Sequence, residues 1–121
     1  MRTTIQIPTY ECKITFEVVP TNKDVCLKTN SICKRFKKPQ EAKEGDISWG
    51  ECYSPDINNY FMIISKESLK DYNFNTFFHE LFHIIDMVTS DRDIEDGEAK
   101  AYLQGHIGQS FIKKLLNYLK T

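Results

Sequence analysis

One segment of the sequence, "FNTFFHELFHIIDMV" over residues 74–88, constrains the fold more than any other. Its apolar residues recur at the three- and four-residue spacing of an α-helix and cover much of the circumference. No proline interrupts the segment. It therefore predicts a largely buried, central helix, whose apolar positions are Phe74, Phe77, Phe78, Leu81, Phe82, Ile84, Ile85 and Val88.

Two histidines and a glutamate lie within this apolar segment. His79 and His83 are four residues apart, so their imidazoles lie on one side of a helix, one turn apart, where both can bind one metal ion. Glu80 lies about 100° around the helix, from where its carboxylate can reach a water bound to that ion. Zinc lowers the pKa of such a water toward about 7, and a carboxylate can take its proton. The H-E-x-x-H pattern thus predicts a Zn²⁺ site with Glu80 as general base.

A purely structural interpretation of these residues is also open, with the two imidazoles and the carboxylate hydrogen-bonded in the core. Polar groups left unpaired in an apolar environment cost about 1–3 kcal/mol each. Metal binding removes that cost. The apolar composition around the pattern therefore favours the metal site.

A hydrolytic zinc site usually has three protein ligands and one open position. The third histidine of the pattern H-E-x-x-H-x-x-G-x-x-H is absent, because Thr89 occupies its place. A carboxylate from the following helix is expected instead. Glu98 is favoured, because it begins "EAKAYLQG", whose small residues allow a close approach; Glu95, in the acidic connector, is the alternative.

Three further polar residues have open roles. Asp86 can orient an imidazole from outside the ligand shell, or can be a plain carboxylate at a helix end. Tyr102 lies one turn beyond Glu98, where its hydroxyl could stabilise an oxyanion, although a packed aromatic is the commoner role. His106 is expected on the polar surface.

The rest of the chain predicts strands first and a helix last. "TIQI" and "ECKITFEVV" favour a hairpin with "PTY" between them, and "DISWGECYS" and "NNYFMIIS" favour two further strands. "NSICKRFKK" is expected to form a short helix capped by Ser31, and Asp93 or Asp96 is expected to cap the last helix. The predicted apolar face of that last helix contains Ala101, Tyr102, Gly105, Ile112, Leu115, Leu116 and Leu119.

Composition limits the remaining possibilities. The 121 residues are expected to form a single domain, residues 1–121. A net charge of −1 gives no strong signal for nucleic-acid binding, and the basic stretch 34–38 is typical of a solvated surface. The sequence shows no secretory signal and no apolar run long enough to span a membrane, so we expect a cytoplasmic protein. In that compartment its four cysteines, Cys12, Cys26, Cys33 and Cys52, are expected to be free thiols.

The run from "GECYS" to "HELFHIID", followed by "DGEAKAYLQGHIGQ", resembles the small zincin metallopeptidases of bacteria and their phages, of the gluzincin kind. The resemblance covers roughly residues 50–109. It implies an α+β, zincin-like fold, in which a small twisted, mostly antiparallel sheet packs on the H-E-x-x-H helix and a C-terminal helix. It also implies that His79, His83 and Glu98 bind zinc, and that an edge strand in "GECYS" or "YFMIIS" pairs with an extended peptide.

These features predict a zinc-dependent metallopeptidase that cleaves a protein or peptide substrate with zinc-activated water and Glu80 as base. The alternative is a non-catalytic binding protein on the same scaffold, for example a phage protein that engages a host partner. Small size and the lack of a dedicated substrate domain motivate this second hypothesis.

Overall fold

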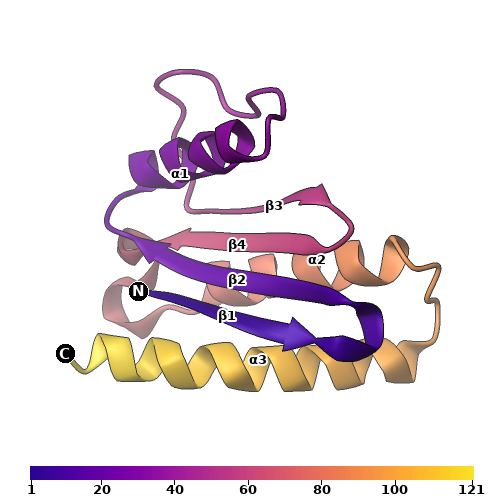
Figure 1. Cartoon of the computed structure of the whole chain (residues 1–121). Helices are drawn as coiled ribbons and strands as arrows, with labels where there is room; N and C mark the ends of the chain where they lie inside the picture. Colours follow the sequence, from indigo (N-terminus) through magenta and orange to yellow (C-terminus); the bar gives the residue numbers. More distant parts are fainter.

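The computed structural model describes all 121 residues, and its centre is a four-stranded mixed sheet (Figure 1). The strands are β1 (Arg2–Ile7), β2 (Cys12–Val19), β3 (Gly50–Asp56) and β4 (Asn59–Ser65), in the order β1-β2-β4-β3. The pairs β1/β2 and β3/β4 are antiparallel, whereas β2 and β4 are parallel. The expected α+β class, hairpin and mostly antiparallel sheet are confirmed.

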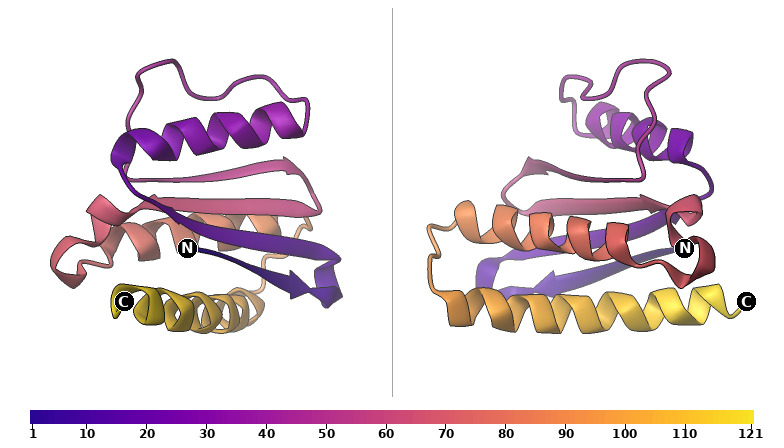
Figure 2. Two further views of the ribbon diagram at one scale, coloured as in Figure 1. Left: turned by 60° about the vertical axis from the view of Figure 1, so that its left-hand side comes forward. Right: turned by 180° about the vertical axis from the view of Figure 1, so that it is seen from behind.

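Helices cover both faces of this sheet (Figures 1 and 2). Helix α1 (Asn22–Arg35) lies on one face, in the connection that leads from β2 through β3 to the parallel strand β4. Helices α2 (Asn75–Ser90) and α3 (Gly97–Leu119) lie side by side on the other face. The larger apolar cluster lies between the sheet and these two helices, and a smaller one lies under α1. Burial on both faces explains why β4 is apolar at almost every position.

Helix α1 corrects the expectation of a short helix beginning at Ser31. Its cap lies ten residues before Ser31, at Thr21, whose hydroxyl accepts a hydrogen bond from the Asp24 N–H. The Asp24 carboxylate in turn accepts one from the Thr21 N–H at 3.0 Å, which completes a capping box. Ser31 is therefore an exposed residue inside the helix. The sequence "TNKD" fits a capping box, but the polar residues that follow it weaken the apolar periodicity of the helix.

Helices α2 and α3 bury narrower faces than their apolar content suggests. Phe78 and Phe82 of α2 are 54% and 62% exposed, so the expectation of a largely buried helix holds only for one face of α2. Asp96 caps α3 as expected, since its carboxylate accepts from the Glu98 N–H. The predicted face of α3 is wrong in most positions, and Tyr102 is 75% exposed. Because α3 packs against β1 as well as α2, the residues it buries are Leu103, Ile107, Phe111 and Leu115.

The side chain of Arg92 joins three segments at one end of the sheet. Its guanidinium donates to the Tyr10 carbonyl at 2.8 Å, to the Ile57 carbonyl, and to the Tyr60 hydroxyl at 2.8 Å. The buried Tyr60 hydroxyl donates in turn to the Asp91 carboxylate. Burial and this hydrogen bond raise the pKa of Tyr60 to about 12. The phenol therefore stays neutral, and this network ties the end of α2 to both strand turns.

Two other findings bear on the sequence expectations. None of the helices combines the length and the apolar character needed to cross a bilayer. All four cysteines are free, and three of them are buried.

Candidate metal centre

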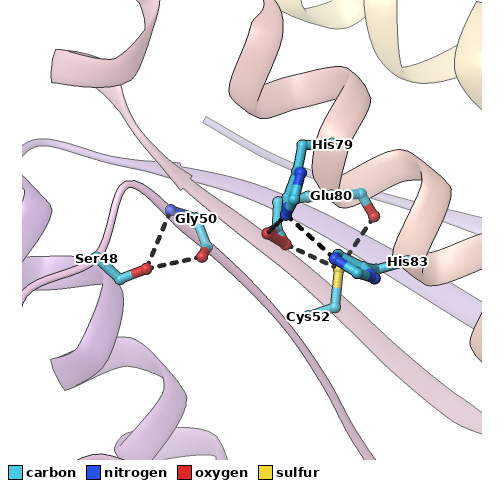
Figure 3. Close-up of polar contacts among 6 residues, drawn as sticks. All are labelled: Ser48, Gly50, Cys52, His79, Glu80 and His83. Atoms are coloured by element: carbon cyan, nitrogen blue, oxygen red, sulfur yellow. Dashed lines mark hydrogen bonds and ion pairs between the residues drawn. The ribbon is translucent and has the colours of Figure 1, made fainter.

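The structure brings His79 and His83 together on the solvent-facing side of α2 (Figure 3). Their Nε2 atoms lie 3.1 Å apart, and their ring centroids lie 4.6 Å apart. One oxygen of the Glu80 carboxylate lies near both, so that the three candidate ligand atoms are all within 4.8 Å of one another. Imidazole nitrogens with a carboxylate oxygen are a donor set that suits Zn²⁺. The residues present therefore fit the metal that the pattern predicts.

Unlike the two exposed histidines, Glu80 is buried, and its side chain lies where α2 contacts β3. Its side chain is 7% exposed. The Cys52 thiol donates to its Oε2 at 3.4 Å and to its backbone carbonyl at 3.1 Å. Its Oε1 lies 3.9 Å from the His79 Nε2. Burial raises the pKa of the Glu80 carboxyl above its usual value, and the hydrogen bond from Cys52 and the two imidazoles only partly offset this rise. A raised pKa makes a carboxylate a better general base.

Burial also raises the pKa of the Cys52 thiol, and the neighbouring Glu80 carboxylate raises it further. Cys52 is therefore a neutral thiol that positions Glu80, not a thiolate nucleophile. The sequence alone does not reveal this role, because the two residues are far apart in the chain and no motif links them.

Gly50 lets β3 approach α2 closely at this point. A Cβ atom at position 50 would lie 2.8 Å from Glu80 Cγ and 2.8 Å from Thr76 Cγ2. Real side chains do not tolerate such distances, so any larger residue must displace β3 or Glu80. Glycine is thus required at position 50 because of the close packing of β3 on Glu80 and Thr76.

We expect Gly50→Ala to lower the free energy of unfolding by about 1–3 kcal/mol, because of this overlap. Urea unfolding followed by circular dichroism measures the change. Gly105→Ala is the matched control: a Cβ there meets no atom within 4 Å, and alanine in a helix should stabilise by up to about 1 kcal/mol. Equal stability of Gly50→Ala and wild type would contradict the close approach.

A cleft of about 500 Å³ lies between α2, β3 and the loop that joins α1 to β3. Glu80, His83 and Asp86 line it from α2. Asp86 is exposed one turn beyond His83, and no hydrogen bond joins the two side chains. The other lining residues are Glu41, Ala42, Asp46, Gly50, Glu51, Cys52 and Met87. His83 therefore lies at the wall of an acidic cleft, with His79 one turn before it on α2.

Glu98, the expected third ligand, lies away from the histidine pair. A Cβ atom at Gly108 of α3 would lie 3.1 Å from Leu81 Cδ2, which places these two residues level on the antiparallel helices. At 1.5 Å per residue, Glu98 is then about 12 Å beyond His83 along the helix axes. The carboxylate is exposed and outside the cluster of ligand atoms. The structure thus does not bring Glu98 into the cluster of His79, Glu80 and His83, and its role as third ligand stays a prediction.

The remaining sequence-based candidates are also separate from the histidines. Tyr102 lies on the flank of α3 that faces the β1–β2 turn, where it lines a pocket with Gln6 and Tyr10. Its ring stacks on the imidazole of His106, with the two ring centroids 6.3 Å apart. The expected oxyanion role of Tyr102 therefore has no geometric support. Glu95 is exposed in the loop between α2 and α3.

On this geometry, Glu98→Gln should leave the zinc dissociation constant within about threefold of wild type, because the carboxylate makes no contact with the pair. His83→Ala should raise it at least about 100-fold, since it removes one of the two candidate imidazole ligands. Competition with a chromophoric chelator measures both values. A large loss of affinity in Glu98→Gln would show that the metal draws the first turn of α3 toward α2.

Comparisons of this chain with protein-family models, with curated protein sequences and with solved structures found no match.

Proposed function

We propose that this protein is a zinc-dependent metallopeptidase with a zincin-like fold. The observation that carries the proposal is the cluster of His79, His83 and Glu80, of which His83 and Glu80 line a cleft beside a free sheet edge. His79 and His83 would hold the ion. When bound, Zn²⁺ would supply an activated water and would polarise the carbonyl of the substrate.

Glu80 is the proposed general base. Its carboxylate is mostly buried, and its Oε1 accepts no hydrogen bond within the protein. This oxygen can take a proton from the attacking water and deliver it to the leaving amine. The Cys52 thiol, which bonds to the other carboxylate oxygen, would hold the base in this orientation.

The free edge of β3 supplies a binding site for an extended peptide. Of the two strand segments that the sequence offered, "YFMIIS" is the interior strand β4 and "GECYS" is the edge strand β3. The Trp49 carbonyl accepts from the Ser65 N–H, so Gly50 points its backbone groups away from β4. The backbone N–H and C=O groups of successive residues in an antiparallel strand point alternately to its two sides, so those of Cys52 face the same outer edge as those of Gly50, next to Glu80.

Ser48 occupies one end of this edge (Figure 3). Its hydroxyl donates to the Gly50 carbonyl at 2.8 Å and accepts a hydrogen bond from the Gly50 N–H at 3.3 Å. The hydroxyl thus satisfies the groups that another strand would pair. A peptide added to β3 would begin at Cys52 and pass the Glu80 carboxylate.

The proposal is tested by zinc content and peptide hydrolysis of the full chain. We expect one zinc per chain, cleavage of a denatured protein substrate, loss of cleavage after chelation, and its return on adding zinc. A His79→Ala/His83→Ala double variant should neither bind zinc nor cleave. Purified wild-type protein that fails to take up one equivalent of zinc would refute the proposal.

A second candidate function is a binding protein on the same scaffold without hydrolysis. Two observations favour it: no protein ligand other than Glu80, the proposed base, lies near the histidines, and Phe78 and Phe82 are exposed on the same helix. A stoichiometric, uncleaved partner captured equally by wild type and Glu80→Gln would support this function. A partner that is fragmented only by wild type would exclude it.

A further inference from the structure

The cleft beside the histidines has a strongly negative lining. Glu41 and Asp46 come from the loop between α1 and β3, Glu51 from β3 and Asp86 from α2. No lysine or arginine lines the cleft. The two ion pairs that lysine and arginine form in the protein both involve Glu17. The four carboxylates therefore have no cationic partner within 4.0 Å.

Glu41 and Asp46 are the most available of these carboxylates. Glu51 already accepts hydrogen bonds from the Thr29 hydroxyl at 2.7 Å and from the Cys26 thiol. Asp46 uses only Oδ2, which accepts from the Lys43 backbone N–H at 2.8 Å. Both Glu41 and Asp46 are exposed on the side of the cleft opposite α2.

Two features support a ligand in the cleft, and the second of them suits an extended peptide. The Glu80 side chain is 7% exposed and lines the cleft, and its Oε1 accepts no hydrogen bond from the protein. The outer edge of β3 forms another wall, where the backbone groups of Cys52 face outward and those of Gly50 are held by Ser48. A strand edge of this kind pairs with extended chains.

We propose that the cleft selects extended peptides that carry a lysine or arginine side chain, which Glu41 and Asp46 receive. The choice of a peptide as ligand rests on the proposed peptidase function. One exposed ion pair contributes little. Several unpaired carboxylates around one cationic side chain attract it together, and low-dielectric walls strengthen their field. The preference belongs to the cleft, not to the whole surface, because the net charge of the protein is only −1.

The test compares two fluorogenic peptides that differ only in arginine or glutamine at one position, scanned along the peptide. At low salt we expect the arginine peptide to have a kcat/KM about tenfold higher at its best position, and this ratio should fall as salt is added. Glu41→Gln/Asp46→Asn should reduce the ratio at least about threefold. Glu44→Gln, an exposed carboxylate in the same loop outside the cleft, should not change it.

Binding of the labelled peptides to Glu80→Gln separates this inference from the proposed function. Stronger binding of the arginine peptide, weakened by Glu41→Gln/Asp46→Asn, supports the inference even if wild type cleaves nothing. Cleavage of both peptides at equal rates would overturn the inference and leave the peptidase function standing. An arginine preference that persists in the double variant would also overturn it.

Discussion

Glu80→Gln is expected to reduce peptide hydrolysis about 10²–10⁴-fold while the protein still binds zinc, because general-base catalysis contributes this much in enzymes that use it. Glutamine has nearly the same shape as glutamate and can keep the contact with the Cys52 thiol. It cannot accept the proton of the attacking water. Steady-state cleavage of a fluorogenic peptide, measured beside zinc content, separates loss of the base from loss of the metal.

Glu44→Gln is the matched control for this experiment, because the same chemical change is made at an exposed position outside the cleft, in the loop between α1 and β3. Its activity should stay within about twofold of wild type, as surface substitutions usually have small effects. Retention of full activity in Glu80→Gln would remove Glu80 from the mechanism. A parallel loss of zinc would instead make Glu80 a metal ligand, which its closeness to both imidazoles permits.

Arg92→Met is expected to lower the free energy of unfolding by about 2–4 kcal/mol. The substitution keeps an apolar stem but leaves the Tyr10 and Ile57 carbonyls and the Tyr60 hydroxyl without their donor. Each unsatisfied buried polar group costs about 1–3 kcal/mol, and partial access of water reduces the total. Urea unfolding followed by circular dichroism or fluorescence gives the change, with the midpoint as the sensitive quantity.

Two further variants show whether the geometry or the charge of Arg92 matters. Arg92→Lys keeps the charge but not the planar fork, so it should recover less than half of the loss. Arg2→Met removes an exposed arginine that pairs with Glu17 at 3.7 Å, and it should cost less than about 1 kcal/mol. A loss from Arg92→Met no larger than that from Arg2→Met would show that the network contributes little to stability.

Elements defined by short-range patterns were predictable from the sequence. The β1–β2 hairpin, the strand β4 and the helix with the histidines appear where the patterns indicate, and Asp96 is the cap of the two offered. Strand β3 begins four residues later than its pattern indicates, at Gly50, and runs on to Asp56. The start of α1 was missed because a capping box signals only the first turn, and the polar residues after it carry a weak apolar period. The buried face of α3 was missed because its apolar residues point to more than one side.

What the sequence by itself determined is the pairing of His79 with His83 and the position of Glu80 beside them. A helix sets the direction of residues one and four positions apart, whatever else packs around it. The tertiary structure alone decided that Glu98 lies about two turns away, that β3 is the free edge beside Glu80, and that Glu41 and Asp46 face Asp86 across a cleft. These relations depend on the offset between α3 and α2 along their axes and on the order of strands in the sheet. They join residues far apart in the chain, and no local spacing encodes them.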